Sequence, residues 1–111
     1  MNSIRNLPVT QRLINLAEEC TECAQAALKM FRALNGDTPV SQMEARENLI
    51  EEIADVSVCM TALGDMAPLS DVGEIITEKA NRWTERINAG QDPDARRKLM
   101  EAGYDEEATN D

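Results

Sequence analysis

The chain has 111 residues, a formal net charge of −10, no histidine and three cysteines. This length suits one domain, so we expect a single domain spanning 1–111. The acidic balance argues against binding to long nucleic acids, because no broad basic surface is available to displace counterions from phosphates. The chain has no apolar run near 18 residues and no signal-peptide pattern at its start, which predicts a cytoplasmic protein outside the membrane.

Apolar residues recur at helical spacing along most of the chain. The predicted helices cover 10–34, 43–63, 71–88 and 92–102. Gly36 is a typical residue to end the first, and Ser41 with Glu44 matches a capping box that opens the second. Asp71 is expected to begin the third helix and Gly90 to end it.

This pattern predicts an all-α fold, an antiparallel bundle of about four helices. Its core is expected over 10–88, with the fourth helix as a short C-terminal addition. The tail over 103–111 is acidic and is expected to be disordered.

The first two predicted helices carry most of the apolar residues. On the first, the residues expected to form the main buried stripe are Leu13, Leu16, Ala17, Cys20, Ala24, Ala27, Leu28 and Phe31. The second helix is apolar nearly all the way round over 49–63, which predicts burial on all sides, and it is a candidate for a break near Asn48.

Two pairs of acidic residues stand out within these helices. Glu19 and Glu22 lie three residues apart, as do Glu52 and Asp55, so each pair shares one helix face. Small neighbours such as Ala26 on the side of Glu19 predict that a second helix covers it. Packed side by side, the two helices would bring four carboxylates together as a site for Mg²⁺, with Mn²⁺ a second option. The alternative is that Glu19 and Glu22 are ordinary solvated charges.

The cysteines are Cys20, Cys23 and Cys59, of which the first two form a C-x-x-C. A redox version of this motif usually lies at a helix N-terminus, whereas this one falls in the middle of a predicted helix. Without histidine, a zinc site would need a carboxylate as fourth ligand, which is uncommon. Buried, inert thiols are therefore expected, with metal or redox use as the alternative.

The acidic residues resemble the pattern of the MazG-like, all-α nucleoside triphosphate pyrophosphohydrolases. That pattern is E-E-x-x-E, a spacer and E-x-x-D, matched here by Glu18, Glu19 and Glu22 and then by Glu52 and Asp55. The surrounding sequences LAEECTECAQA and ENLIEEIADVSVCMTAL resemble the family beyond the acidic positions, over most of the chain.

The resemblance implies a homodimer or homotetramer and a defined reaction. It implies catalytic, Mg²⁺-binding carboxylates at Glu19, Glu22, Glu52 and Asp55. It also implies cleavage of a nucleoside triphosphate between its α- and β-phosphates, which yields a monophosphate and pyrophosphate. Either Glu51 or Glu22 is positioned in the sequence to orient the attacking water.

Basic residues follow on the third predicted helix. Lys79 and Arg82 share a stripe with Arg86, and the resemblance implies that Lys79 and Arg82 bind the substrate phosphates. The alternative is that these side chains pair with acidic neighbours on an exposed rim. Trp83 suits a core or interface better than a nucleobase, and Asn48 suits a cap better than a phosphate contact.

A second functional class fits the same features. An acidic helical module with a degenerate site would bind a protein partner without catalysis. Turnover of a nucleotide distinguishes the enzyme from this interaction module.

Overall fold

The computed structural model describes residues 3–91, 94, 97–98 and 101, and all regular structure among them is helical. The three α-helices are α1 (Val9–Asn35), α2 (Gln42–Ala62) and α3 (Leu69–Gln91). Two short 3₁₀ turns, η1 (Ile4–Asn6) and η2 (Gly64–Met66), precede α1 and follow α2. The predicted all-α class is confirmed, whereas the tail over 103–111 and most of the predicted helix over 92–102 lie outside the described residues.

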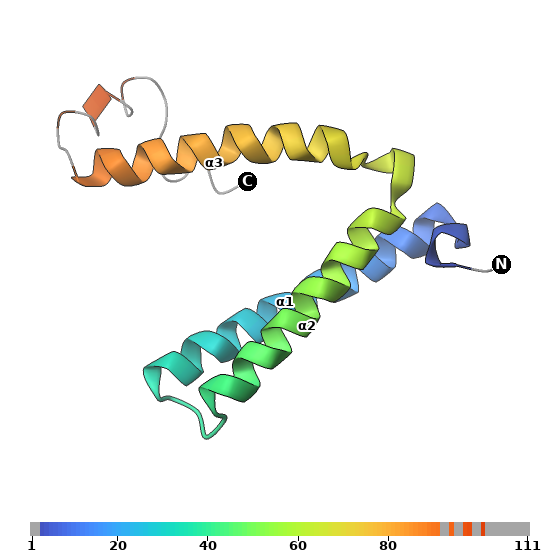
Figure 1. Ribbon diagram of the computed structural model, residues 1–111, viewed down its shortest axis with the longest axis horizontal. Coiled ribbons are helices and arrows are strands. Elements are labelled where there is room, and N and C mark those ends of the chain that lie inside the picture. The colour runs from blue at the N-terminus through green and yellow to red at the C-terminus, as the bar shows by residue number, and fades with distance from the viewer. Residues whose placement is uncertain (1–2, 92–93, 95–96, 99–100, 102–111) are drawn as a thin grey trace. The chain divides into compact units, whose positions relative to one another are not determined.

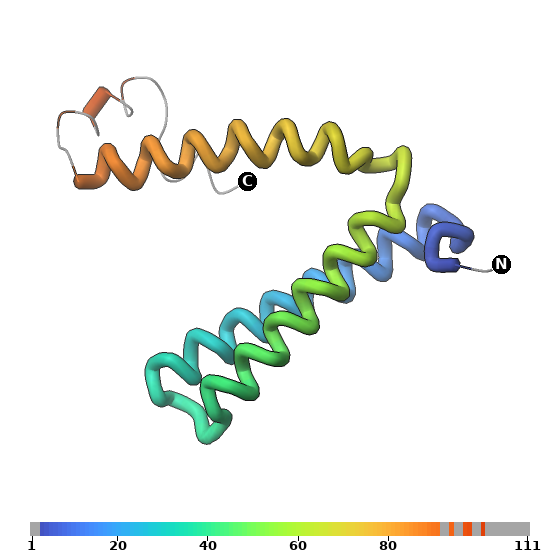
Figure 2. The backbone as a smooth tube through the Cα atoms, in the orientation of Figure 1, coloured from blue at the N-terminus to red at the C-terminus, as the bar shows by residue number. Residues whose placement is uncertain are grey.

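The chain divides into two compact units, Met1–Leu69 and Ser70–Asp111. The first is an antiparallel hairpin in which α1 and α2 lie side by side (Figure 1). The backbone trace reverses direction between them in a short turn (Figure 2). The second unit holds nearly all of α3. Among the described residues, no helix has the length and apolar character that crossing a membrane requires.

The turn between α1 and α2 follows from local sequence signals. Gly36 ends α1 with φ of 74°, a left-handed conformation that costs glycine little. The backbone N–H of Asp37 then donates to the carbonyl of Arg32 at 2.9 Å. Ser41 opens α2, and its Oγ accepts a hydrogen bond from the Glu44 backbone N–H at 3.1 Å. Both predicted helix ends at this turn are confirmed.

Three predicted helix features are wrong. α2 runs through Asn48 without a break. α3 begins at Leu69, so Asp71 lies in its first turn, where a carboxylate still interacts favourably with the helix dipole. α3 also continues past Gly90, because this glycine keeps a helical backbone while the positive-φ glycines of the described chain are Gly36 and Gly64.

Small residues line the contact between α1 and α2. The buried residues of the two helices are Ala26, Ala33, Ala45, Cys59 and Ala62. Side chains of this size let two helix backbones approach closely. We call this contact the α1–α2 interface. It covers the side of α1 that bears Ala26, which confirms the prediction that a second helix lies there.

The predicted main apolar stripe is not buried within the hairpin. Leu28 and Phe31 of α1 are 55% and 58% exposed, and Ile50 and Ile53 of α2 are each 51% exposed. In a hairpin of two helices, each helix is covered by the other on one side only. The small residues lie on that covered side here. Several of the larger apolar residues, Ile50 and Ile53 among them, are exposed, so the expectation of burial all round α2 is wrong for this chain alone.

Candidate metal centre

Three carboxylates meet across the α1–α2 interface. Glu19 and Glu22 lie one helical turn apart on α1, and Glu52 reaches them from α2. One carboxylate oxygen from each lies within 4.8 Å of the other two. We call these three residues the carboxylate cluster. The prediction that the two acidic stretches approach one another is therefore confirmed for three of its four residues.

Asp55 lies next to the carboxylate cluster and outside it. Its side chain is exposed, and it is absent from the compact group that Glu19, Glu22 and Glu52 form. Its negative charge nevertheless contributes to the raised pKa of both Glu19 and Glu52. The predicted compact group of four is thus a group of three with a fourth charge nearby.

Burial and mutual repulsion both disfavour the ionised form of the cluster. Burial is the largest cause of the raised pKa of Glu19, followed by the charge of Glu22 and a hydrogen bond with it, then by Asp55 and Glu52. For Glu52 the raised pKa again comes first from burial, then from the charges of Glu22 and Asp55. A hydrogen bond with Glu22 and the charge of Glu51 add to it.

The two half-buried glutamates also carry oxygen atoms with unmet bonding capacity. The Oε2 atoms of Glu19 and Glu52 are buried and have no hydrogen-bond partner among the described residues. Such an atom loses its hydration without replacement, which is unfavourable unless a proton or a cation takes the place of water. An all-oxygen ligand set suits a hard divalent cation, so the residues present fit Mg²⁺ or Mn²⁺.

The raised pKa values predict how pH affects stability without metal. Because Glu19 and Glu52 have folded pKa values above the ordinary value of 4.5, the folded state binds more protons than the unfolded state between those values. Their contribution to the free energy of unfolding therefore falls as pH rises through about 4.5 and is lost above the folded pKa values.

Urea unfolding without metal, measured from about pH 4.5 to pH 8, should show this decline. The fall in the free energy of unfolding should be smaller in Glu52→Gln. In a second series, added Mg²⁺ should reduce the fall in the wild-type protein. Equal pH dependence in the two proteins would contradict the repulsion assigned to the cluster.

The cysteines differ in their surroundings. Cys59 is buried at 6% exposure, whereas Cys20 is exposed and Cys23 is half-buried, so the prediction of buried thiols holds fully for Cys59 alone. Burial raises the pKa of Cys59, and the negative charges of Glu19 and Asp55 raise it further, with a smaller effect from Cys20. No group of three potential metal ligands among the described residues includes a cysteine.

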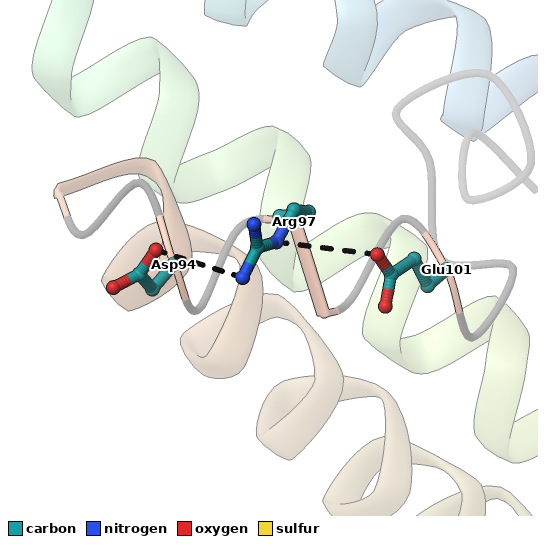
Figure 3. Close-up of polar contacts among 3 residues, drawn as sticks. All are labelled: Asp94, Arg97 and Glu101. Carbon is teal, nitrogen blue, oxygen red and sulfur yellow. Dashed lines mark ion pairs between the residues drawn. The ribbon is translucent and has the colours of Figure 1, made fainter.

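The two basic residues predicted to bind phosphate lie on α3. Lys79 and Arg82 are half-buried, and neither forms an ion pair within the described part of the chain. Arg97 differs, since it is exposed and lies 3.8 Å from Asp94 and 4.0 Å from Glu101 (Figure 3). The alternative in which Lys79 and Arg82 pair with acidic neighbours therefore has no support among these residues.

Arg12 is not among the residues predicted from the sequence, yet it contacts two other parts of the hairpin. Its Nη1 donates to the carbonyl of Ala62 at 2.9 Å, and its Nε donates to the carbonyl of Leu7 at 2.9 Å. No signal in the sequence indicated this role, because the partners of Arg12 are backbone carbonyls.

Comparisons with known proteins found no counterpart for this chain. No family model, no curated protein and no solved structure matches it.

Proposed function

We propose that this protein is a Mg²⁺-dependent nucleotide pyrophosphohydrolase that also accepts Mn²⁺. Its substrate is a nucleoside triphosphate, cleaved between the α- and β-phosphates. The observation that carries the proposal is the carboxylate cluster, in which three acidic side chains from two helices converge with two buried, unpartnered oxygens. The resemblance of the acidic pattern to the MazG-like pyrophosphohydrolases supplies the reaction.

The proposed division of labour uses residues from both acidic stretches. Glu19, Glu22 and Glu52 hold the cation, and the adjacent Asp55 adds negative charge or a further oxygen ligand. When bound, Mg²⁺ neutralises phosphate oxygens and lowers the pKa of a coordinated water. Glu51 is exposed and directly precedes Glu52 on α2, so it is the residue proposed to accept the proton of the attacking water.

Attack by the water oxygen forms a bond to phosphorus while the bridging P–O bond to the pyrophosphate leaving group breaks. The electron pair of that bond remains on the pyrophosphate, whose negative charge rises. Lys79 and Arg82 are the cations proposed to stabilise this charge. Phosphoryl transfer depends mostly on positioning and charge neutralisation, so none of the three thiols is needed as a nucleophile.

The test is direct measurement of products. The purified protein is incubated with each ribo- and deoxyribonucleoside triphosphate and Mg²⁺, and monophosphate and pyrophosphate are quantified by chromatography. We expect equal amounts of the two products from at least one substrate and no turnover with excess chelator. Release of orthophosphate with a diphosphate would contradict the proposed bond, and turnover in chelator would contradict the proposed metal.

We also propose that a second copy of the chain covers the outward apolar faces, as a homodimer or homotetramer. Among the described residues no large side chain is fully buried, while Leu28, Phe31, Ile50 and Ile53 are each at least half exposed. Exposed large apolar side chains that gather on a surface often mark a protein–protein interface, and obligate homodimer interfaces are apolar.

Phe31→Glu is expected to lower the oligomeric state. Phe31 is 58% exposed on α1, and a carboxylate at a buried interface would lose its hydration without a partner. Sedimentation velocity should show at least twice the chain mass for the wild-type protein and monomer for the variant. Gln25→Glu is the control, because it adds the same charge at an exposed polar position on the same helix. A wild-type monomer would contradict the proposed assembly.

The same outward apolar residues favour one other candidate function. A non-catalytic helical module would use them to bind a different protein, with the carboxylate cluster retained but inactive. A folded oligomer that turns over no nucleoside triphosphate in the product assay would favour this module over the enzyme.

A further inference from the structure

Arg12 of α1 forms hydrogen bonds with the backbone at the C-terminal end of α2. Its Nη1 donates to the Ala62 carbonyl at 2.9 Å and makes a longer contact of 3.5 Å with the Leu63 carbonyl. Both contacts run from a side chain of α1 to backbone carbonyls at the end of α2. The last carbonyls of a helix lack intrahelical partners and form the negative end of its dipole, so a guanidinium there meets both needs.

The rest of the α1–α2 interface does little to fix how far one helix slides along the other. Its buried residues are alanines and one cysteine, whose small side chains interlock little with the facing helix. No large side chain is fully buried among the described residues. The carboxylate cluster lies across the same interface, and its like charges push the helices apart when no cation is bound. A specific polar contact therefore has more influence on the register here than in a well-filled core.

Arg12 lies on the same stripe of α1 as Glu19 of the carboxylate cluster. Glu19 follows Arg12 by seven residues, which is two helical turns and about 10.5 Å along the axis. Holding Arg12 against the end of α2 thus determines which residue of α2 lies opposite Glu19. In the observed register Glu52 lies within reach of both Glu19 and Glu22, and one carboxylate oxygen of each lies within 4.8 Å of the other two.

We propose that Arg12 is a positioning residue for the carboxylate cluster, whose contact with the last carbonyls of α2 sets the register that lets Glu19, Glu22 and Glu52 hold one cation. The inference rests on the proposed function, because that function assigns the cation to the cluster. Arg12 touches neither substrate nor cation and acts through the position of α1.

A role of Arg12 through its charge and a role through its position predict opposite changes in cation affinity for Arg12→Gln. Removing a positive charge about 10 Å from a cation site would tighten cation binding by less than about twofold after screening. Losing the register would weaken it by about tenfold or more, as changes behind metal ligands commonly do. Mn²⁺ alone is the probe, and its affinity is measured by calorimetry and by the loss of the free-ion paramagnetic resonance signal.

Arg46→Gln is the matched control. Arg46 is exposed on α2, six residues before Glu52, and makes no side-chain hydrogen bond within the described chain. Its removal changes the net charge equally at a similar distance, so Mn²⁺ affinity should be unchanged or slightly tighter. Arg12→Lys keeps the charge and one donating group, and we expect it to recover part of the affinity lost in Arg12→Gln.

A second measurement tests the register of α1 against α2 directly, in the absence of metal. In the metal-free wild-type protein, nuclear Overhauser contacts should join the side-chain protons of Glu22 and Glu52. These contacts should weaken or disappear in Arg12→Gln, or in Arg12→Lys if the glutamine variant does not fold. A folded variant with wild-type Mn²⁺ affinity and intact contacts would overturn the inference. A wild-type protein that shows the contacts and binds no Mn²⁺ would instead refute the proposed function.

Discussion

Glu52→Gln is expected to lower kcat/KM for the preferred nucleoside triphosphate by at least about a hundredfold. Glu52 is the residue that α2 contributes to the carboxylate cluster, and its buried Oε2 has no partner among the described residues. Glutamine keeps the size of the side chain and one oxygen but removes the negative charge that would bind the cation. The loss should appear in Mn²⁺ affinity as well as in turnover.

The same substitution should stabilise the protein in the absence of metal at about pH 7, where repulsion within the cluster is greatest. The glutamine amide can donate a hydrogen bond to a neighbouring carboxylate, whereas the Glu52 carboxylate repels Glu19 and Glu22. A rise in the free energy of unfolding together with a fall in turnover would separate a functional effect from damage to the fold.

Glu47→Gln is the control for this pair of measurements. Glu47 is exposed on the same helix and lies outside the carboxylate cluster, so the variant makes the same change in charge. It should match the wild-type protein in turnover and in Mn²⁺ affinity. If Glu52→Gln were folded and fully active, Glu52 would have no role in the reaction and the assignment of the cluster would be wrong.

Local signals were sufficient to predict much of the hairpin. Gly36 and Ser41 predicted the end of α1 and the start of α2, because a left-handed glycine and a capping hydroxyl act through their nearest neighbours. The pairing of Glu19 with Glu52 could also be predicted, since small residues such as Ala26 marked the side of α1 that another helix covers.

The burial of the large apolar residues could not be predicted in the same way. Phe31 and Ile53 lie on apolar stripes, and a stripe indicates that something covers it without saying which chain does. Arg12 was missed for a related reason, because its partners are backbone carbonyls at the end of another helix, which no side-chain pattern marks. Asp55 lies outside the cluster because the spacing of three residues fixes a helix face but not the distance across an interface.

Arg82→Gln should reduce kcat/KM by about ten- to a hundredfold while leaving Mn²⁺ affinity unchanged. Arg82 lies on α3, half-buried and without an ion pair within the described chain, and Lys79 lies one turn before it. A free guanidinium would bind two phosphate oxygens and stabilise the charge that develops on pyrophosphate. Arg82→Lys should keep part of the activity, since an ammonium supplies the charge without the planar pair of donors.

Arg97→Gln is the matched control, because it removes the same charge from a position 15 residues after Arg82. Arg97 is exposed and pairs with Asp94 and Glu101, and exposed pairs of this kind contribute little. Its loss should therefore leave turnover unchanged. If Arg97→Gln and Arg82→Gln lowered kcat/KM equally, the effect would come from net charge and not from a phosphate contact at Arg82. A selective loss in Arg82→Gln with normal Mn²⁺ binding would instead assign substrate phosphate to α3 and the cation to the hairpin.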